Sequence, residues 1–402
     1  MEGKRFIHTL RLQNFLSYGG EGEEIELQPL NVLIGPNASG KSNFIEAMGL
    51  LKATPTNLTA PIRKGGGMGE WLWKGEKEPP VAKIEAIVDY PEGVMPLRYR
   101  VGFTSSNQRL ELIDEAVENK LPNDGENQPY FFYRYQEGYP VLNVKTKPES
   151  QAGTAIGRSE RRLRREQLIP DQSVLSQRKD PDQYPELTYL SKEFSQISLY
   201  RDWHIGRNYE PRMPQKTDLP EHPLLEDGSN LGLVLNNLQY QLGSRQIIDK
   251  LQKFYDEAEE LSVKIYGGTV QIFIREEGLI QPIPATRLSD GTLRYLFLLA
   301  LLLDPTPPPL VCIEEPEIGL HPDMMSTIAD LLVEASRRTQ LIVTTHSEAL
   351  VSSLPPESVL VCERNQWGSH LRRLDSDLLK EWLKEFSLGH LWRMGEIGGT
   401  RW

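Results

Sequence analysis

The feature that most constrains this chain is a glycine-rich loop, Gly35-Pro36-Asn37-Ala38-Ser39-Gly40-Lys41-Ser42. It follows the apolar run Leu30 to Ile34 and precedes a helix-like segment, which is the strand, loop and helix order of a phosphate-binding loop. The glycines let the backbone bend closely around an anion, and the positive helix N-terminus points at that anion. We expect Lys41 to contact the β- and γ-phosphates of a triphosphate and Ser42 to bind Mg²⁺.

Composition sets the broad class. The 402 residues can bury a sizeable core and hold two or three substructures. The longest apolar run, Tyr295 to Leu303, is too short to span a bilayer, and the N-terminus lacks a signal pattern, so we expect a cytoplasmic protein without a membrane partner. Cys312 and Cys362 lie in β-like apolar runs and are expected to be buried thiols. The net charge of −11 restricts any DNA contact to a local patch.

The first part of the chain is rich in strand patterns. Phe6 to Leu12 predicts a strand, and short alternating runs between Val81 and Val144 predict an antiparallel sheet.

The middle of the chain interrupts this pattern. Thr146 to Pro223 is richer in Pro, Ser, Gln and charge, and we expect a compact, mainly helical lobe there. One predicted helix in it carries a basic cluster that could contact nucleic-acid phosphates or an acidic partner, although a solvated helix face remains the alternative. The cluster consists of Arg158, Arg161, Arg162, Arg164 and Arg165.

Strand patterns return near the end of this region. A second helix is expected near Ile247 to Leu261, followed by strands at Ser262 to Tyr266, Thr269 to Arg275 and Leu279 to Pro284. Arg287 to Arg294 then begins a strongly apolar helix that should run to about Leu303.

The start of that apolar helix has two readings. Ser289 or Asp290 could simply cap the first N–H groups of the helix. The second reading comes from the resemblance given below, which implies that a serine hydroxyl, the N–H of Gly291 and the helix N-terminus meet an anion.

Two later strands end in polar residues. Leu310 to Ile313 leads to Glu314, Glu315 and Glu317, and another apolar strand ends at His346. Ligands of open α/β sheets bind at the carboxyl ends of strands, so these side chains are candidates for metal binding and proton transfer. Acidic residues at a solvated strand end are the ordinary alternative, which the order of the motifs disfavours.

The tail offers one further acidic pair. Asp375 and Asp377 form a DxD pattern that could suggest a metal-dependent nuclease, but Ser376 and Asp377, which precede Leu378, favour a cap on a helix from about Asp375 to Phe386.

As a set, these motifs resemble the ABC-type ATPases of the RecF, SMC and OLD group, close to the stand-alone ATPases predicted in bacterial anti-phage modules. The resemblance covers about residues 1–80 and 225–402. It rests on the opening Leu12-x-Asn14-Phe15-x-x-Tyr18 pattern, the phosphate loop, the Ser289-Asp290-Gly291 signature, Glu314-Glu315-Pro316-Glu317, and Gly319-Leu320-His321-Pro322.

The resemblance implies a role for each motif residue. Glu314 would orient Mg²⁺, Glu315 would accept a proton from the attacking water or position it, and His346 would hydrogen-bond the γ-phosphate and that water. Ser289 and Gly291 would meet the γ-phosphate of ATP held by another subunit. His321 would contact the opposite subunit or only shape its turn. A glutamine that senses Mg²⁺ is expected, with Gln108, Gln128 and Gln136 as equal candidates.

The implied architecture is an α/β P-loop ABC-type ATPase head, made of a mixed sheet with helices and an antiparallel β subdomain. Residues 1–145 and 241–402 would form the head, and residues 146–240 would form the inserted, mainly helical lobe. The sequence has no sustained heptad repeat, so we do not expect the long coiled-coil arm of SMC proteins.

The implied function is an ATPase switch. Mg-ATP would join two heads and hydrolysis would separate them, controlling a separate effector such as a nuclease in anti-phage defence. Two alternatives stay open: a RecF-like repair ATPase that binds DNA directly, and an ATP-dependent scaffold that does not hydrolyse ATP.

Overall fold

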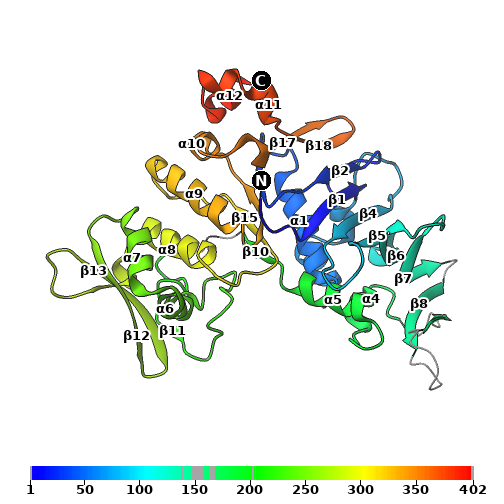
Figure 1. Cartoon of the computed structure of the whole chain (residues 1–402), viewed down its shortest axis with the longest axis horizontal. Coiled ribbons are helices and arrows are strands. Elements are labelled where there is room, and N and C mark those ends of the chain that lie inside the picture. The colour runs from blue at the N-terminus through cyan, green and yellow to red at the C-terminus, as the bar shows by residue number, and fades with distance from the viewer. Residues whose placement is uncertain are drawn as a thin grey trace.

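Three β-sheets organise the molecule (Figure 1). The computed structural model describes residues 2–136, 139–146, 157–162, 168–201, 203 and 205–399, with only the backbone described at 136, 145–146 and 157–162. Among the described residues no helix is long and apolar enough to cross a membrane. Cys312 and Cys362 are both buried free thiols, as predicted.

The central sheet has six strands and carries the predicted site. Its order is β10 (Ser198–Tyr200), β15 (Leu310–Glu314), β16 (Gln340–Thr344), β3 (Leu30–Ile34), β17 (Val359–Asn365) and β18 (Gly368–Arg373). The first five strands are parallel, and β18 is antiparallel to β17.

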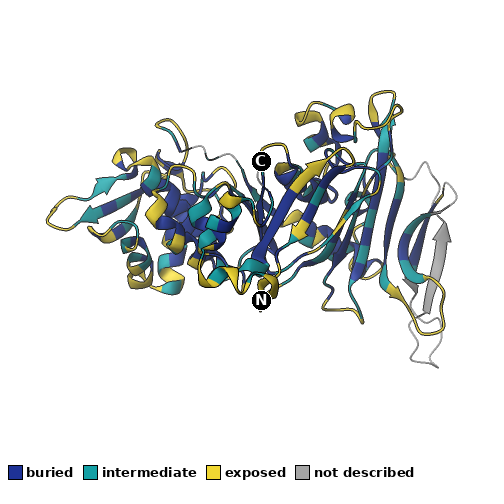
Figure 2. Ribbon diagram, turned by 90° about the horizontal axis from the view of Figure 1, so that it is seen from above, coloured by how far each residue is buried: buried dark blue, intermediate teal, exposed yellow. Residues whose placement is uncertain are grey.

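The strands β3, β15 and β16 at the centre of this sheet are buried on both faces, which explains their continuous apolar sequences. Along β3, Val32 packs into one hydrophobic core and Leu33 into the other. In β15, Val311 and Cys312 divide in the same way. Because side chains of a strand alternate between faces, the central sheet separates the two cores. Figure 2 shows buried residues on both sides of these strands.

The second sheet has eight antiparallel strands and confirms the sheet predicted over 81–144. Its order is β2 (Glu23–Glu26), β1 (Ile7–Gln13), β4 (Ala82–Val88), β5 (Leu97–Ser106), β6 (Arg109–Pro122), β7 (Pro129–Gln136), β8 (Tyr139–Thr146) and β9 (Gly157–Arg162).

The core between these two sheets is closed by helices. They are α1 (Lys41–Ala53), α2 (Thr59–Lys64), α3 (Met68–Trp71), α4 (Val174–Gln177) and α5 (Pro185–Ser195). In α1, the apolar residues at helical spacing, Phe44, Met48 and Leu51, are fully buried.

The third sheet lies on the other side of the central sheet (Figure 1). It contains β11 (Gln215–Lys216), β13 (Thr269–Glu276), β12 (Ala258–Tyr266) and β14 (Ile283–Pro284). It shares the second core with the helices α6 (Leu231–Leu242), α7 (Ser244–Gln252), α8 (Asp290–Leu302), α9 (Met325–Ala335), α10 (Glu348–Ser352) and α12 (Leu388–Met394).

The structure corrects three expected helices. The backbone at Arg158, Arg161 and Arg162 is in strand β9, paired with β8, because the edge of the antiparallel sheet accepts one more strand; Arg164 and Arg165 lie outside the described residues. The helix expected near 247–261 ends at Gln252, and β12 starts at Ala258. The tail helix is limited to α11 (Ser376–Leu379) and a 3₁₀ turn.

The expected inserted lobe, residues 146–240, is only partly separate from the head. Its described part contributes α4, α5 and most of α6, but it also supplies β10. Ser198, Leu199 and Tyr200 of β10 pair in parallel with β15 inside the central sheet. The pairing gives β15 a second hydrogen-bonded neighbour besides β16, so a segment from the middle of the chain becomes part of the central sheet.

Candidate nucleotide-binding site

The predicted motifs meet at one edge of the central sheet. Strands β15, β16 and β3 are parallel neighbours in this order. Their carboxyl ends therefore lie side by side, as expected for the binding edge of an open α/β sheet. The phosphate loop follows β3, the acidic residues follow β15, and His346 follows β16.

The phosphate loop has the backbone conformation that its glycines permit. Gly35 and Gly40 have φ angles of 146° and 114°, and Ala38 between them also has a positive φ of 64°. A Cβ atom on Gly35 would lie 2.2 Å from the carbonyl oxygen of Cys362, so no larger residue fits there. Tyr18, at the end of the predicted N-terminal pattern, donates its hydroxyl to the Gly40 carbonyl at 3.1 Å.

Lys41 is folded into this loop. Its Nζ donates to the carbonyl oxygens of Gly35 at 2.8 Å and Pro36 at 2.9 Å. Burial lowers the pKa of Lys41, and the nearby charges of Cys362 and Glu315 partly oppose the decrease. The ammonium group is thus held at the mouth of the loop, beside the acidic strand end.

The first turn of α1 supplies the remaining anion donors. The first hydrogen bond into this helix runs from the Phe44 N–H to the Gly40 carbonyl at 3.0 Å. The N–H groups of Lys41, Ser42 and Asn43 precede it and point away from the helix body. Together with Lys41 Nζ, they fit the phosphates of a nucleotide.

The donor set also fits Mg²⁺. Ser42 and Glu314 line the same cavity of about 860 Å³, together with Glu46 and Arg201. A hydroxyl and a carboxylate are hard oxygen ligands, and Mg²⁺ in such sites takes few protein ligands and completes its shell with phosphate oxygens and water.

Glu315 and His346 face each other across the strand ends. His346 Nε2 lies 3.8 Å from Glu315 Oε1, and both side chains are about two-fifths exposed. The backbone of Glu315 has a φ of 49°, and its N–H donates to the Thr344 carbonyl at 2.9 Å. A left-handed conformation is costly for glutamate, so the neighbouring strand must hold this carboxylate in place.

Glu317 fixes the loop that carries His346. Its Oε1 accepts hydrogen bonds from Thr345 Oγ1 and from the His346 N–H, both at 2.7 Å. Thus the third carboxylate of the acidic strand end orients the histidine, a role that the sequence did not reveal.

Ser289 and Gly291 lie elsewhere. Ser289 is exposed at the N-terminus of α8 and accepts a hydrogen bond from the Thr292 N–H at 3.0 Å, so it is a helix cap. A Cβ on Gly291 would be 3.1 Å from the carbonyl of Gly319, which places the signature beside the loop after β15. Neither residue lines the cavity shared by Ser42 and Glu314.

None of the three candidate glutamines lies at this cavity. Gln108 is in the turn between β5 and β6, Gln128 accepts a hydrogen bond from Arg134, and Gln136 ends β7, all in the eight-stranded sheet.

The cavity instead contains Arg201, which follows β10. Its Nη1 donates to Glu46 Oε1 at 2.7 Å, and its Nε lies 3.5 Å from Glu314 Oε1. Sequence reasoning missed Arg201 because β10 is short and belongs to a polar stretch, and only its pairing with β15 brings it to the site.

Two other predicted candidates have local structural roles. His321 Nδ1 accepts from the Asp323 N–H at 3.3 Å and caps a Pro-bounded turn, with its side chain exposed. A helix cap is present here, as predicted, but the capping residue is Asp375, which accepts from the Asp377 N–H at 2.8 Å, whereas Ser376 and Asp377 lie inside α11.

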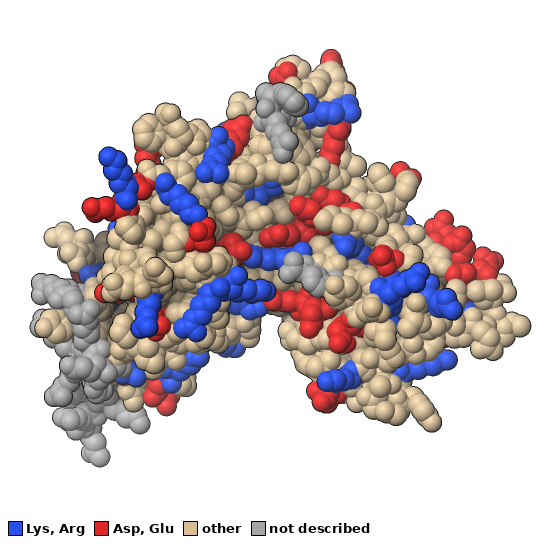
Figure 3. Space-filling model, turned by 180° about the vertical axis from the view of Figure 1, so that it is seen from behind, with Lys and Arg blue, Asp and Glu red and all other residues tan. Residues whose placement is uncertain are grey.

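Charge on the surface is mixed. On the face in Figure 3, Lys and Arg side chains are interspersed with Asp and Glu among the described residues, and they form no continuous basic surface.

Two comparisons relate the chain to known proteins. It is 34% identical over 92 residues to the DNA replication and repair protein RecF of Staphylococcus haemolyticus, covering 23% of this chain and 22% of that one. It is 27% identical over 116 residues to RecF of Lactococcus lactis, covering 29% and 28%. The chain thus matches less than a third of the length of these relatives.

Solved structures share the fold over nearly the whole chain. The Smc head domain of Pyrococcus furiosus, bound to the C-terminal domain of ScpA, superposes with a TM-score of 0.57 at 14% identity, covering 94% of this chain and 99% of that chain. An Smc head bound to the C-winged helix domain of ScpA gives 0.56 at 15% identity, covering 94% and 100%.

A family model matches residues 30–352, which include every motif at the strand ends and most of the chain. Its description is an AAA domain, putative AbiEii toxin, Type IV TA system. The chain therefore belongs to this AAA domain family, and it has an SMC head-like α/β fold.

Proposed function

We propose that this protein is a Mg²⁺-dependent ATPase in which two copies close around ATP. Each site would combine the phosphate loop of one copy with Ser289 and Gly291 of the other. The observation that carries the proposal is the division of the motifs: the loop, Glu315 and His346 share one edge, whereas Ser289 is exposed on α8 and lines no part of that cavity.

The residues at the strand ends have distinct chemical roles in this proposal. Lys41 and the N–H groups of α1 bind the phosphates, and Ser42 and Glu314 hold the metal ion. Bound Mg²⁺ would neutralise charge on the phosphate oxygens. Glu315 accepts a proton from the attacking water or positions it, and His346 hydrogen-bonds the γ-phosphate.

The 3.8 Å between Glu315 and His346 leaves both groups able to contact one water molecule. Charge that develops on the transferred phosphoryl group is stabilised by Lys41 and by the N-terminus of the partner's α8. Neither copy alone holds a complete reaction centre.

The ATPase would act as a switch on another protein. The matched family is described with a putative toxin of a Type IV TA system, which supports a role in a toxin-linked or anti-phage module. We propose a separate effector, such as a nuclease, as the partner. Purification of the full chain from its native cells should recover such an effector in an ATP-dependent complex.

The test of the ATPase proposal uses the Glu315→Gln variant, in which ATP binding is kept and hydrolysis is slowed. Light scattering with Mg-ATP should give about twice the mass seen without nucleotide. The matched control, Glu315→Gln with Lys41→Met, should stay at the lower mass because the phosphates are not bound. An unchanged mass for Glu315→Gln would contradict the proposal. Normal ATP-dependent mass with no phosphate release by wild type would select the non-hydrolysing scaffold.

Direct DNA binding is the second candidate, and the RecF similarity favours it. The basic cluster around β9 would then contact phosphates. The triple variant Arg161→Ala, Arg162→Ala and Arg164→Ala should lose a steeply salt-dependent DNA affinity. Equal DNA binding by the triple variant and the wild type would contradict a role of this cluster in DNA binding.

A further inference from the structure

Three side chains that follow β10 connect the two halves of the proposed composite site within one chain. They are Arg201, Trp203 and Arg212, which we call the connector residues. They contact, in order, the phosphate-loop helix, the end of the acidic strand and the signature loop.

Arg201 joins α1 to the acidic strand end. Its guanidinium donates to Glu46 at 2.7 Å and forms an ion pair with Glu314 at 3.5 Å. Its Nη2 is buried and has no hydrogen-bond partner among the described residues. Arginine presents several donors in a fixed plane, so one guanidinium holds Glu46 and Glu314 in a set relation to Ser42, which lines the same cavity.

Trp203 joins the acidic strand end to the signature helix. Its Nε1 donates to the backbone carbonyl of Glu314 at 2.6 Å. The Arg294 guanidinium of α8 lies 4.9 Å from the centre of the Trp203 ring, and the ring of Phe297, also in α8, packs edge-on at 5.4 Å. The indole therefore contacts β15 through its polar atom and α8 through its faces.

Arg212 holds the signature loop itself. It is only 5% exposed, and its guanidinium donates to the carbonyl oxygens of Ala285 and Leu288 and to the Asp290 carboxylate. Leu288 and Asp290 flank Ser289. Removal of this buried guanidinium would leave the two carbonyl groups without those donors, so Arg212 sets the position of the Ser289 backbone.

We infer that the connector residues relay the state of the acidic end of β15 to the signature loop of the same chain. A shift of Glu314 moves Trp203 through its carbonyl, and Trp203 moves α8 through Arg294 and Phe297. Arg212 holds the start of α8 against the segment after β10 that carries Trp203, so the two move together. This inference rests on the proposed function and describes how the composite site would be regulated. A copy presents Ser289 to its partner in the correct position only when Mg-ATP is bound at the acidic end of its own β15.

The test measures communication inside one chain, without dimerisation. The variant Ser289→Arg places a bulky charge where the partner would bind and should remain a monomer. Hydrogen exchange of the backbone amides at 288–293 is then followed with and without Mg-ATP. We expect Mg-ATP to slow this exchange at least threefold in Ser289→Arg, because the connector acts in cis.

Two changes to the connector should abolish that response. Trp203→Phe keeps an aromatic ring beside Arg294 but removes the N–H that donates to the Glu314 carbonyl. Arg212→Lys keeps the positive charge but loses the planar guanidinium that donates to several acceptors at once. Each is added to Ser289→Arg. The matched control is Arg207→Lys, an exposed arginine between the connector residues. Urea unfolding of each variant checks that it is folded, and binding of a fluorescent ATP analogue should stay within twofold of Ser289→Arg.

The outcomes separate this inference from the proposed function. If amides at 288–293 do not respond to Mg-ATP in Ser289→Arg, or respond equally in the Trp203 and Arg212 variants, the relay is wrong, whatever the mass of Glu315→Gln. If the relay holds but Glu315→Gln does not double its mass with Mg-ATP, the dimeric function is wrong and the cis relay survives.

Discussion

Lys41 shows how a single side chain is prepared for its ligand. The residue is 7% exposed, and among the described residues its ammonium group donates to two carbonyl oxygens of its own loop. Neutral carbonyls compensate an ammonium less well than phosphate oxygens do, so exchange of partners favours binding of an anion.

Substitution of Lys41 should therefore separate binding from stability. We expect Lys41→Met to weaken ATP binding roughly a hundredfold, which corresponds to about 3 kcal/mol for lost charge-assisted contacts. The free energy of unfolding should change by less than about 1 kcal/mol, because the buried ammonium costs desolvation. Titration with a fluorescent ATP analogue and urea unfolding measure the two effects. The control Lys253→Met, an exposed lysine after α7, should alter neither.

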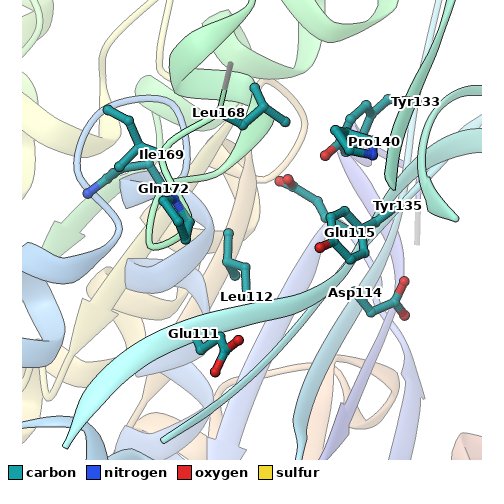
Figure 4. Close-up of a pocket in the computed structure, with 11 residues that line it drawn as sticks. Glu111, Leu112, Asp114, Glu115, Tyr133, Tyr135, Pro140, Leu168, Ile169 and Gln172 are labelled. Atoms are coloured by element: carbon teal, nitrogen blue, oxygen red, sulfur yellow. The ribbon is translucent and has the colours of Figure 1, made fainter. Parts of the chain in front are cut away.

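Glu115 is a buried carboxylate remote from the motifs. It lines a pocket with Tyr133, Tyr135 and Asp114 (Figure 4). It accepts hydrogen bonds from the Tyr99 hydroxyl at 2.8 Å, from Ser173 Oγ and from the Val174 N–H at 2.9 Å. Burial raises its pKa from 4.5 to about 7, and the hydrogen bonds only partly oppose that effect.

This raised pKa predicts the pH dependence of stability. The folded chain holds the Glu115 proton more tightly than the unfolded chain, so its contribution is fully present below pH 4.5 and is lost as pH rises through about 7. The loss amounts to about 3 kcal/mol. In urea unfolding at pH 5 and pH 8, Glu115→Gln should lack this part of the pH dependence. If the free energy of unfolding changes between pH 5 and pH 8 by the same amount in Glu115→Gln as in the wild type, the assignment to Glu115 is contradicted.

At the scale of single residues, the candidates that the structure brings to one edge are those that the sequence places near the ends of strands or at the start of a helix. Glu314 ends β15, Glu315 and His346 follow the ends of β15 and β16, and Lys41 and Ser42 begin α1 after the loop that follows β3. Parallel pairing of the three strands brings these segments to one edge. The connector residues could not be found this way. Arg201 and Glu46 are 155 positions apart, and Arg212 and Asp290 are 78 apart, so no spacing signals their contacts.

Among the elements, β16 joins two sheets at its first residue, in addition to leading to His346 at its other end. Its first residue, Gln340, is fully buried. Its Oε1 accepts from the N–H groups of Phe6 and Ile7 at 3.2 and 2.8 Å, and its Nε2 donates to the carbonyls of Ile7 and Gln28. One amide thus ties the N-terminal strand of the eight-stranded sheet to the central sheet.

Loss of that amide should be costly. Gln340→Leu keeps the volume but leaves buried N–H and carbonyl groups without partners, which should lower the free energy of unfolding by about 3 kcal/mol. Urea unfolding measures the change, and the exposed Gln281→Leu is the matched control. A loss below about 1 kcal/mol would mean that water replaces the amide at this junction.

Strand and helix prediction failed at the elements whose type is decided by distant partners. The arginine-rich segment at 158–162 has no apolar periodicity, yet its backbone completes the edge of the eight-stranded sheet. Ala258 to Leu261 was expected to continue a helix but pairs with β13 in a long hairpin. In both places tertiary pairing overrides local propensity.

For the whole molecule, the central claim is that two copies build each reaction centre. Ser289 is exposed, and α8 lies on the far side of the central strands from α1 in Figure 1. The two halves of a site therefore come from different faces of the head, which suits a symmetric pair in which each copy supplies both halves once.

Mixing of two inactive variants tests this claim most directly. Lys41→Met lacks phosphate binding but keeps its signature, and Ser289→Arg lacks a signature but keeps its phosphate loop. Each alone should release no phosphate from ATP above background. An equimolar mixture should recover up to roughly half of wild-type phosphate release, because neither variant pairs with itself around ATP and each mixed pair has one intact site of two. Full inactivity of the mixture, or hydrolysis by Ser289→Arg alone, would contradict a site shared between two copies.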